Sequence, residues 1–420
     1  MVRSPISRRL TTAAWLALHT VVPVVHAEPD DNALGKFADY PVGTTSGNWY
    51  NDPYRVGSWS AMDKVRGLPA RVVPRGGAVS PLPAAPQPSA ISYKFRNITY
   101  SLDEYLERRR VTGLLILKNG QVVTERYRYD RTEDARFLSF SMAKSVVSML
   151  VGIAEQKGLV ASLDDPAEKY AKEMAGSAYG GTTIRQLLRM SSGLTFTERY
   201  DGNDDVQRMA YAQATGRPPV VQVLRSIVDR HSPAGEKFIY ASAETEILGR
   251  VLAGATGRPV AAVTSEWLWQ PLGAERDAFW IVGQDGQERT SGFFNATLRD
   301  WGRLGWMMAR DGKVGDVQVV PRDYVLDATD AARQPAQFKP RRASPYWGYG
   351  YQVWLFPMRE RTFGFQGVYG QAVFVQPASG IVMVQTAVFE TASGQQNPLP
   401  GQERDAFWRG VLQSLGGTTD

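Results

Sequence analysis

The chain has 420 residues, of which 43% are hydrophobic and 21% are charged. This composition is typical of an ordinary soluble globular protein, and the length suffices for one large domain or two fused ones. The formal charge is +6, but no cluster of lysine and arginine with interleaved aromatic residues is present, which argues against nucleic-acid binding. The sequence has no cysteine, so it excludes disulfides and thiolate catalysis.

Residues 1–27 have the pattern of an export signal peptide. Three arginines precede an apolar stretch over residues 13–25, and Val25-His26-Ala27 fits a small-residue cleavage site. The run Ser7-Arg8-Arg9-Leu10 partly matches a twin-arginine signal, and an ordinary secretory signal is an equal alternative. Both predict an exported protein, periplasmic or secreted, whose formal charge falls to +3 once the three arginines are removed. No later apolar run has the length of a membrane span.

Residues 28–91 are rich in glycine, proline and aromatic residues, and residues 80–88 are especially rich in proline. We interpret this part as an irregular N-terminal arm followed by a stiff linker. The main domain, residues 92–420, then opens with a predicted hairpin. Apolar residues 111–117 form its first strand, Asn119-Gly120 is a strong two-residue turn signal, and residues 121–129 alternate as the returning strand.

A buried helix is predicted directly after this hairpin, because residues 146–153 are apolar on nearly every side and Gly158 supplies a stop. Helical patterns dominate the inserted region, residues 163–290. They cover residues 183–190, 206–214, 219–230, 243–257 and 260–269, with a further helix at 298–310; strand signals return at 351–356, 371–375 and 381–389, and a helix at 403–415 closes the chain. This order predicts an α/β (α+β) fold, in which both chain ends build one antiparallel sheet flanked by helices, with a mainly helical insertion. We expect the functional site between the sheet and the insertion.

Ser141 and Lys144 are the leading candidates for catalysis. Residues three apart share a helix face, so their side chains can come within hydrogen-bond reach. Burial lowers the pKa of a lysine, and a neutral amine can take the proton from a serine; a helix N-terminus also favours negative charge on that oxygen. Ser141 is therefore predicted to be a nucleophile and Lys144 its base. The alternative is a chance occurrence of Ser-x-x-Lys, since about one is expected from the composition alone.

Histidine is scarce, which limits the other mechanisms. After signal removal only His231 remains, in a run that resembles a turn, so a Ser-His-Asp triad would have to use it. A zinc site built on histidine and cysteine lacks its ligands. The predicted mechanism thus needs no metal and no organic cofactor.

Two further patterns fit serine catalysis. Tyr240 precedes Ser242 by two residues; a phenol beside a lysine ammonium ionises more easily, so Tyr240 is a candidate proton shuttle and Ser242 a supporting residue. The alternative is a buried aromatic followed by a helix-capping serine. Gly367 and Gly370 lead into a strand, and glycines there allow a backbone amide to pair with the Ser141 amide as an oxyanion hole, although such glycines are often only part of a turn.

Several runs carry a resemblance to a known superfamily. Residues 183–194, 233–242 and 267–273 resemble landmarks of the serine β-lactamase and penicillin-recognising superfamily, in the right order around Ser141. More closely, the chain resembles the 6-aminohexanoate-dimer hydrolase branch, which sits beside class C β-lactamases and family VIII esterases. The stretches that carry this closer resemblance are residues 141–145, 196–201, 348–355 and 367–371. The resemblance covers roughly residues 91–415, with a weaker echo at Asn48-Trp49.

The resemblance implies a β-lactamase/transpeptidase-like fold, with Ser141 as the acyl-forming nucleophile, Lys144 as base and Tyr240 as proton shuttle. Ser242 would occupy a position that is often asparagine in β-lactamases. The β-lactamase Lys-Thr-Gly motif has no counterpart, which favours the amide and ester hydrolase branch over a β-lactamase.

In that branch the region after Ser-Gly-Leu shapes the substrate pocket. Glu198, Tyr200 and Asp201 are therefore candidates for contacting an amine or amide end of the substrate. The alternative for all three is a solvated loop.

These inferences predict a serine hydrolase that cleaves an amide or ester bond of a small molecule. The alternatives are a carboxylesterase, a weak β-lactamase or D-amino-acid peptidase, and a penicillin-recognising binding protein without turnover.

Overall fold

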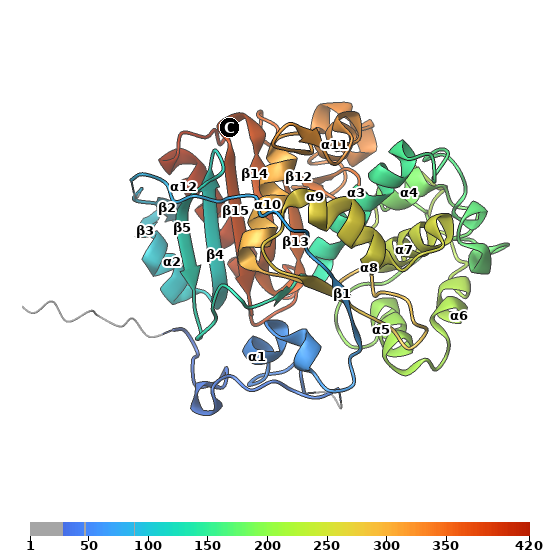
Figure 1. Ribbon diagram of the computed structural model, residues 1–420, viewed down its shortest axis with the longest axis horizontal. Helices are drawn as coiled ribbons and strands as arrows, with labels where there is room; N and C mark the ends of the chain where they lie inside the picture. Colours follow the sequence, from blue (N-terminus) through green and yellow to red (C-terminus); the bar gives the residue numbers. More distant parts are fainter. Residues whose placement is uncertain (1–27, 46–47, 88) are drawn as a thin grey trace, which may run out of the picture.

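The computed structural model describes residues 28–45, 48–87 and 89–420, so the predicted signal peptide lies outside the described residues. Its centre is a seven-stranded antiparallel sheet with the order β11-β12-β13-β14-β15-β4-β5. The strands are β4 (Val111–Lys118), β5 (Gln121–Tyr127), β11 (Gly348–Tyr349), β12 (Trp354–Leu355), β13 (Phe363–Gly367), β14 (Gln371–Gln376) and β15 (Ile381–Ala387). Figure 1 shows β4 and β5 beside β14 and β15, early and late parts of the chain in one sheet. The prediction that both chain ends build one antiparallel sheet is confirmed.

The predicted turn of the first hairpin is also present. Lys118 pairs with Gln121 across β4 and β5, which leaves two residues in the loop. Asn119 and Gly120 have φ of 52° and 76°, the left-handed conformation that a tight two-residue hairpin turn requires.

Helices cover both faces of the large sheet. Alternate residues of β4 point to opposite faces, so Leu114 and Ile116 join one apolar cluster while Leu115 and Leu117 join another. The first cluster includes α2 (Leu102–Arg108) and α12 (Leu399–Ser414), and the second includes α3 (Ala143–Gln156) and α10 (Leu298–Ala309). The sheet is therefore the middle layer of the molecule.

The inserted helices gather at the end of the molecule away from β4 and β5 (Figure 1). They are α4 (Ile184–Leu188), α5 (Asp205–Thr215), α6 (Val220–Arg225), α7 (Ser242–Thr256), α8 (Val260–Thr264), a π-helical turn at Ser265–Trp269, and α9 (Gln270–Leu272). Residues 143–154 of α3 are all buried, as the apolar pattern predicts, and α3 packs against α7. The predicted helix at 219–230 ends early at Arg225, because Arg230 leaves it to bridge Leu194.

A second, four-stranded sheet was not predicted. It has the order β1-β7-β8-β6 and consists of β1 (Ala70–Val73), β6 (Phe137–Leu138), β7 (Ala278–Ile281) and β8 (Phe294–Ala296). The N-terminal arm is thus less irregular than expected, since it contributes β1 and the short helix α1 (Arg55–Trp59). Strands of two to four residues give little periodic signal, and β1 pairs with β7 about two hundred residues later.

The proline-rich linker lies along the free edge of the large sheet. The amide of Ala85 donates to the carbonyl of Val122 in β5, and the amide of Val122 donates to the carbonyl of Pro83. Because β5 is the last strand of its sheet, the linker covers an edge that would otherwise offer unpaired backbone groups.

The remaining elements are short, and two of the turns, Phe140–Met142 and Val368–Gly370, border the cavity described below. They are β2 (Ser92–Phe95), β3 (Ile98–Ser101), β9 (Lys313–Val314), β10 (Val317–Gln318), α11 (Arg322–Thr329), and 3-10 turns at Lys36–Ala38, Met62–Lys64, Phe140–Met142, Ala167–Lys169, Lys172–Met174, Ala331–Arg333, Ala336–Phe338, Val368–Gly370 and Pro377–Ser379. Within the described part of the chain, none of the helices combines the length and the apolar character that a membrane crossing needs.

Candidate active site

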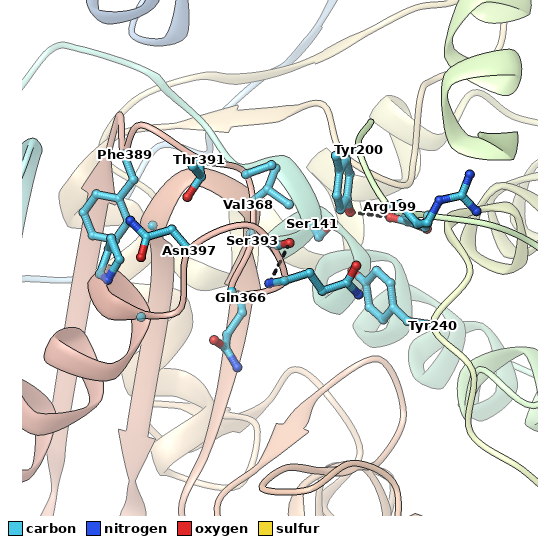
Figure 2. A pocket seen from close by; sticks show the side chains of 18 of the residues that line it. Ser141, Arg199, Tyr200, Tyr240, Gln366, Val368, Phe389, Thr391, Ser393 and Asn397 are labelled. Carbon is cyan, nitrogen blue, oxygen red and sulfur yellow. Dashed lines mark hydrogen bonds between the residues drawn. The ribbon is translucent and has the colours of Figure 1, made fainter. Parts of the chain in front are cut away.

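Ser141 lies at the floor of a cavity of about 560 Å³ between the large sheet and the inserted helices (Figure 2). It sits in the 3-10 turn that leads into α3, directly after Phe140, whose φ of 43° is left-handed. A bulky residue in that conformation is strained and is held only by its surroundings. The turn places the serine hydroxyl at the N-terminal end of a long buried helix, where negative charge is stabilised.

Lys144 lies one turn further along α3 and is 1% exposed. Its Nζ donates to the Ser141 hydroxyl at 2.9 Å, to the Ser242 hydroxyl at 3.0 Å and to the backbone oxygen of Ser291 at 2.6 Å. None of these partners carries a charge, and burial lowers the pKa of Lys144 to about 8. The amine can therefore become neutral near physiological pH, as a base for Ser141 must.

Tyr240 completes the immediate surroundings of the nucleophile. Ser141 lies close enough to lower the pKa of the Tyr240 hydroxyl, and the Lys144 ammonium lies 5.1 Å from the Tyr240 ring centroid. Burial, reinforced by the charge of Glu198, raises the pKa of Tyr240 well above its usual value. This direction is opposite to the expected easier ionisation, because the loss of water outweighs the nearby cation. Tyr240 is thus a neutral phenol that can donate a proton.

Ser242 is the first residue of α7, but it does not cap that helix. Its amide and its hydroxyl donate to the Glu198 carboxylate at 2.7 and 2.8 Å, and the same hydroxyl accepts the Lys144 hydrogen bond. Tyr200 donates to Glu198 as well, at 2.5 Å. The carboxylate therefore fixes Ser242 against Lys144, and its charge raises the pKa of Lys144 in opposition to burial.

The three residues suggested as substrate contacts occupy different places. Glu198 and Tyr200 line the cavity, and the Tyr200 hydroxyl donates a hydrogen bond to the Glu198 carboxylate. Asp201 is absent from the cavity lining; its carboxylate pairs with Arg199 at 2.7 Å and is 44% exposed. The structure thus brings the first two to the site and leaves Asp201 at the surface.

A second carboxylate behind the lysine was missed by the sequence analysis. Glu246, one turn after Ser242 in α7, accepts a hydrogen bond from the amide of Ser291 at 2.9 Å. The carbonyl of that residue is the one that accepts from Lys144. Glu246 is a buried acid in a largely apolar helix, which is a detectable signal, whereas Ser291 lies in a loop that gives none.

Gly367 and Gly370 both line the cavity, at the end of β13 beside Ser141. A Cβ atom at 367 would lie 2.5 Å from the backbone oxygen of Ser139. Gly370 has φ of +96°, and a Cβ there would lie 2.7 Å from the ring of Phe389. The close approach of this turn to the nucleophile therefore requires glycine at both positions. Val368 between them also lines the cavity (Figure 2) and was not singled out from the sequence.

The N-terminal arm supports both backbone turns of the site. The Trp59 ring lies 4.8 Å from that of Phe140 and 5.0 Å from that of Tyr369, measured between centroids. Tyr369 has φ of 62°, so each ring belongs to a residue in a left-handed conformation. Arg55 lies over the Tyr369 ring and donates to the carbonyl of Phe389 at 3.0 Å. These contacts hold the two turns in place.

The alternative mechanisms find no support in this geometry. His231 is not among the residues that line the Ser141 cavity, and its amide donates to the carbonyl of Gly193. No group of three or more histidine, aspartate or glutamate side chains in the described ranges is arranged to hold a metal ion.

The opposite wall of the cavity was largely missed. It comprises Trp347, Trp354 and Gln366 of the sheet region, residues 391–395 and Asn397 of the loop after β15, and Pro400, Gly401 and Arg404 of α12. In this wall the sequence pointed only to residues 348–355, which resemble the 6-aminohexanoate-dimer hydrolase branch but were not assigned a role in binding.

The structure combines a mixed α/β fold with a serine and a lysine at the start of its central buried helix. The model of the Beta-lactamase family matches residues 101–393, and the chain belongs to this family. The resemblance to the serine β-lactamase and penicillin-recognising superfamily is thereby confirmed.

Two curated relatives are hydrolases. The 6-aminohexanoate-dimer hydrolase of Paenarthrobacter ureafaciens is 27% identical over 352 residues, which cover 81% of this chain and 87% of that protein. Esterase EstB of Burkholderia gladioli is 24% identical over 409 residues, covering 77% of this chain and 99% of the esterase.

Solved structures share the fold. A Bacillus anthracis protein provisionally assigned as a 6-aminohexanoate-dimer hydrolase superposes with a TM-score of 0.78 at 21% identity, covering 90% of this chain and all of that one. A family VIII carboxylesterase superposes with a TM-score of 0.52 at 14% identity, covering 71% of this chain and 92% of the esterase. The predicted β-lactamase/transpeptidase-like fold is therefore correct.

Proposed function

We propose that this protein is a serine hydrolase that cleaves an amide or ester bond of a small molecule through an acyl-enzyme on Ser141. The observation that carries the proposal is the buried Lys144 amine, 2.9 Å from the Ser141 hydroxyl, with a pKa lowered to about 8. A serine is a weak nucleophile unless an adjacent base removes its proton, and this amine is placed to do so.

In the first half of the reaction, the Ser141 oxygen attacks the substrate carbonyl carbon while neutral Lys144 takes its proton. The amides of Ser141 and of the turn at residues 367–370 stabilise the oxyanion. Tyr240 donates its hydroxyl proton to the departing nitrogen or oxygen as the bond to carbon breaks, and the Lys144 ammonium restores the Tyr240 proton. An ester joins substrate and Ser141 at this point.

In the second half, a water molecule attacks the ester carbonyl and gives a proton to Lys144. The bond to the Ser141 oxygen breaks, that oxygen regains a proton, and the free acid leaves. Glu198 takes no direct part in either half. It holds Ser242, which in turn holds Lys144, so it is a positioning residue.

An amide substrate is supported by the relationship to a 6-aminohexanoate-dimer hydrolase, and the absence of the Lys-Thr-Gly motif favours the amide and ester hydrolase branch over a β-lactamase. The relationship to esterase EstB favours a second candidate, a carboxylesterase that uses the same residues. We also propose that the protein is exported, on the strength of the pattern in residues 1–27. The mature protein would then begin at Glu28, which N-terminal sequencing of the exported form tests.

The first experiment measures amine release from the linear 6-aminohexanoate dimer beside hydrolysis of a short-chain chromogenic ester, each with Ser141→Ala as the blank. Loss of the nucleophile is expected to lower turnover by at least about 10³-fold while the fold is retained. Cleavage of the ester alone would assign an esterase. Turnover by Ser141→Ala at the wild-type rate, or failure of a covalent serine probe to label the protein, would refute the proposal.

A further inference from the structure

The charges that line the Ser141 cavity are few, and they differ in how well they are compensated. Among the described residues, three formally charged side chains line it: Glu198, Arg199 and Arg404. Glu198 accepts three hydrogen bonds from Ser242 and Tyr200. Arg199 pairs with Asp201 at 2.7 Å and is half exposed to solvent. The charges of Glu198 and Arg199 are therefore compensated by hydrogen bonds, an ion pair or solvent.

Arg404 is different, because its side chain is only 9% exposed and its partners are poor. It donates one hydrogen bond, to the neutral Oε1 of Gln366 at 2.5 Å. Its one ion pair is a loose contact with the Asp405 carboxylate, 3.7 Å from its Nη2, and its Nε is buried without a hydrogen-bond partner. A buried guanidinium is ordinarily matched by a carboxylate in direct contact.

A row of aromatic side chains extends from the nucleophile Ser141 to Arg404. Tyr240, beside Ser141, stacks on Trp354 with centroids 5.5 Å apart, and Trp354 lies 6.1 Å from Trp347. Trp347 lies 6.3 Å from Phe374, and the Arg404 guanidinium sits 5.0 Å over the Phe374 ring. In Figure 2 the Gln366 side chain extends from β13 away from Ser141. The cavity thus offers an apolar path with the reacting serine at one end and a cation at the other.

We propose that Arg404, together with Gln366, binds a carboxylate of the substrate, so that the preferred substrate is an amide or ester with a carboxylate separated from the scissile carbonyl by an apolar chain. The planar guanidinium matches a carboxylate in two parallel hydrogen bonds, and the Gln366 amide supplies a further donor. The methylene chain between the two groups lies along Trp354 and Trp347. This inference rests on the proposed function and specifies the substrate of the same site.

The test compares two substrates that differ only in charge: the linear 6-aminohexanoate dimer and its C-terminal primary amide. The wild-type protein is expected to prefer the carboxylate in kcat/KM by about 10- to 100-fold, the range for hydrogen bonds to a charged group. Arg404→Gln should abolish this preference, mainly by raising KM for the carboxylate compound toward that of the primary amide. Arg199→Gln, which removes the other arginine of the cavity, should keep the preference.

Binding to Ser141→Ala, measured by calorimetry with the same two compounds, separates this inference from the proposed function. Tighter binding of the carboxylate compound would support the subsite even if neither compound is hydrolysed. Equal binding would overturn it, even if both are hydrolysed in a serine-dependent way. An equal loss with both substrates in Arg404→Gln would also overturn it, since that result assigns Arg404 a structural role. The comparison in the Ser141→Ala protein needs no change at 404, so a folding defect there does not weaken the test.

Discussion

The two walls of the cavity are built differently. In the catalytic wall, formed by Ser141, Lys144, Glu198, Tyr240 and Ser242, one chain of hydrogen bonds joins Ser141, Lys144, Ser242 and Glu198. In the α12 wall, formed by Trp347, Trp354, Gln366, residues 391–397 and α12, most hydrogen bonds of the loop join near neighbours, as between the Asn397 amide and the Ser393 carbonyl, and few longer-range ones, such as that from Arg404 to Gln366, are added.

The difference separates two tasks. Groups that move protons must already be oriented when the substrate arrives, and mutual hydrogen bonds provide that orientation. Groups that select a substrate need unmet hydrogen-bonding capacity, since a fully satisfied side chain gains little from a ligand. Substitutions in the catalytic wall should therefore lower kcat, and those in the α12 wall should change KM and substrate preference.

The largest effect is expected from Lys144→Met, which removes the base and keeps a chain of similar length. General acid–base assistance contributes about 10²- to 10⁴-fold, so kcat/KM for any accepted substrate should fall by that factor. Steady-state kinetics give the value, and Lys157→Met, just beyond the end of α3, is the control. A fall of less than tenfold would mean that another group deprotonates Ser141.

A smaller effect, with a diagnostic pH signature, is expected from Glu198→Gln. The wild-type kcat/KM should rise with pH through about 8, because the neutral form of Lys144 is the active one. Glu198 raises the pKa of that lysine, so removing its charge should lower the pKa and move the rising limb to lower pH. The loss of orientation at Ser242 should also reduce kcat about tenfold.

Tyr200→Phe is the matched control for this profile. It removes the hydrogen bond to Glu198 and keeps the carboxylate charge, so its rising limb should stay where the wild-type limb lies. A limb that moves equally in both variants would show that hydrogen bonding, and not charge, sets the pKa of Lys144.

The smallest effect is expected from a change in the α12 wall. Gly401 lines the cavity, and a Cβ there would meet no atom within 4 Å, so Gly401→Leu fits the helix and fills part of the cavity. KM for the 6-aminohexanoate dimer should rise a few-fold, while kcat for a short ester stays unchanged. Gln402→Leu, exposed on the same helix, should leave both constants at their wild-type values. If the two leucines act alike, α12 does not limit substrate size.

The fold was predictable where the signal is local or strongly periodic. Asn119-Gly120 specifies its hairpin by backbone conformation, and the patterns at 243–257 and 298–310 match α7 and α10 to within a residue. The four-stranded sheet was not predictable, because β6 has two residues and its pairing is fixed by distant segments. The closing helix begins at Leu399 and not at 403; Pro400 lies in its first turn, where a missing amide hydrogen costs nothing.

The candidate site was predictable to the extent that its members fall in short motifs. Ser141, Lys144, Tyr240 and Ser242 lie in such motifs, and the structure brings their side chains together. Arg404 could not be predicted as a site residue, because a single arginine in a polar helical pattern looks like any surface residue. Only the folded structure shows that this arginine faces the cavity. Asp201 was suggested as a site residue only because it follows the Ser-Gly-Leu motif. In the structure it forms an ion pair with Arg199 at the surface.

Arg55 contacts Phe389, which lies 334 positions later in the chain. Like Trp59, Arg55 supports the turn that contains Tyr369. Neighbours so distant in sequence meet late, since closing a long loop delays their encounter. During synthesis the arm emerges first and can pack on Phe140, but its contacts with Tyr369 and Phe389 have to wait for the end of the chain. We therefore expect the turn at residues 368–370, beside Ser141, to reach its final shape only when almost the whole polypeptide is present.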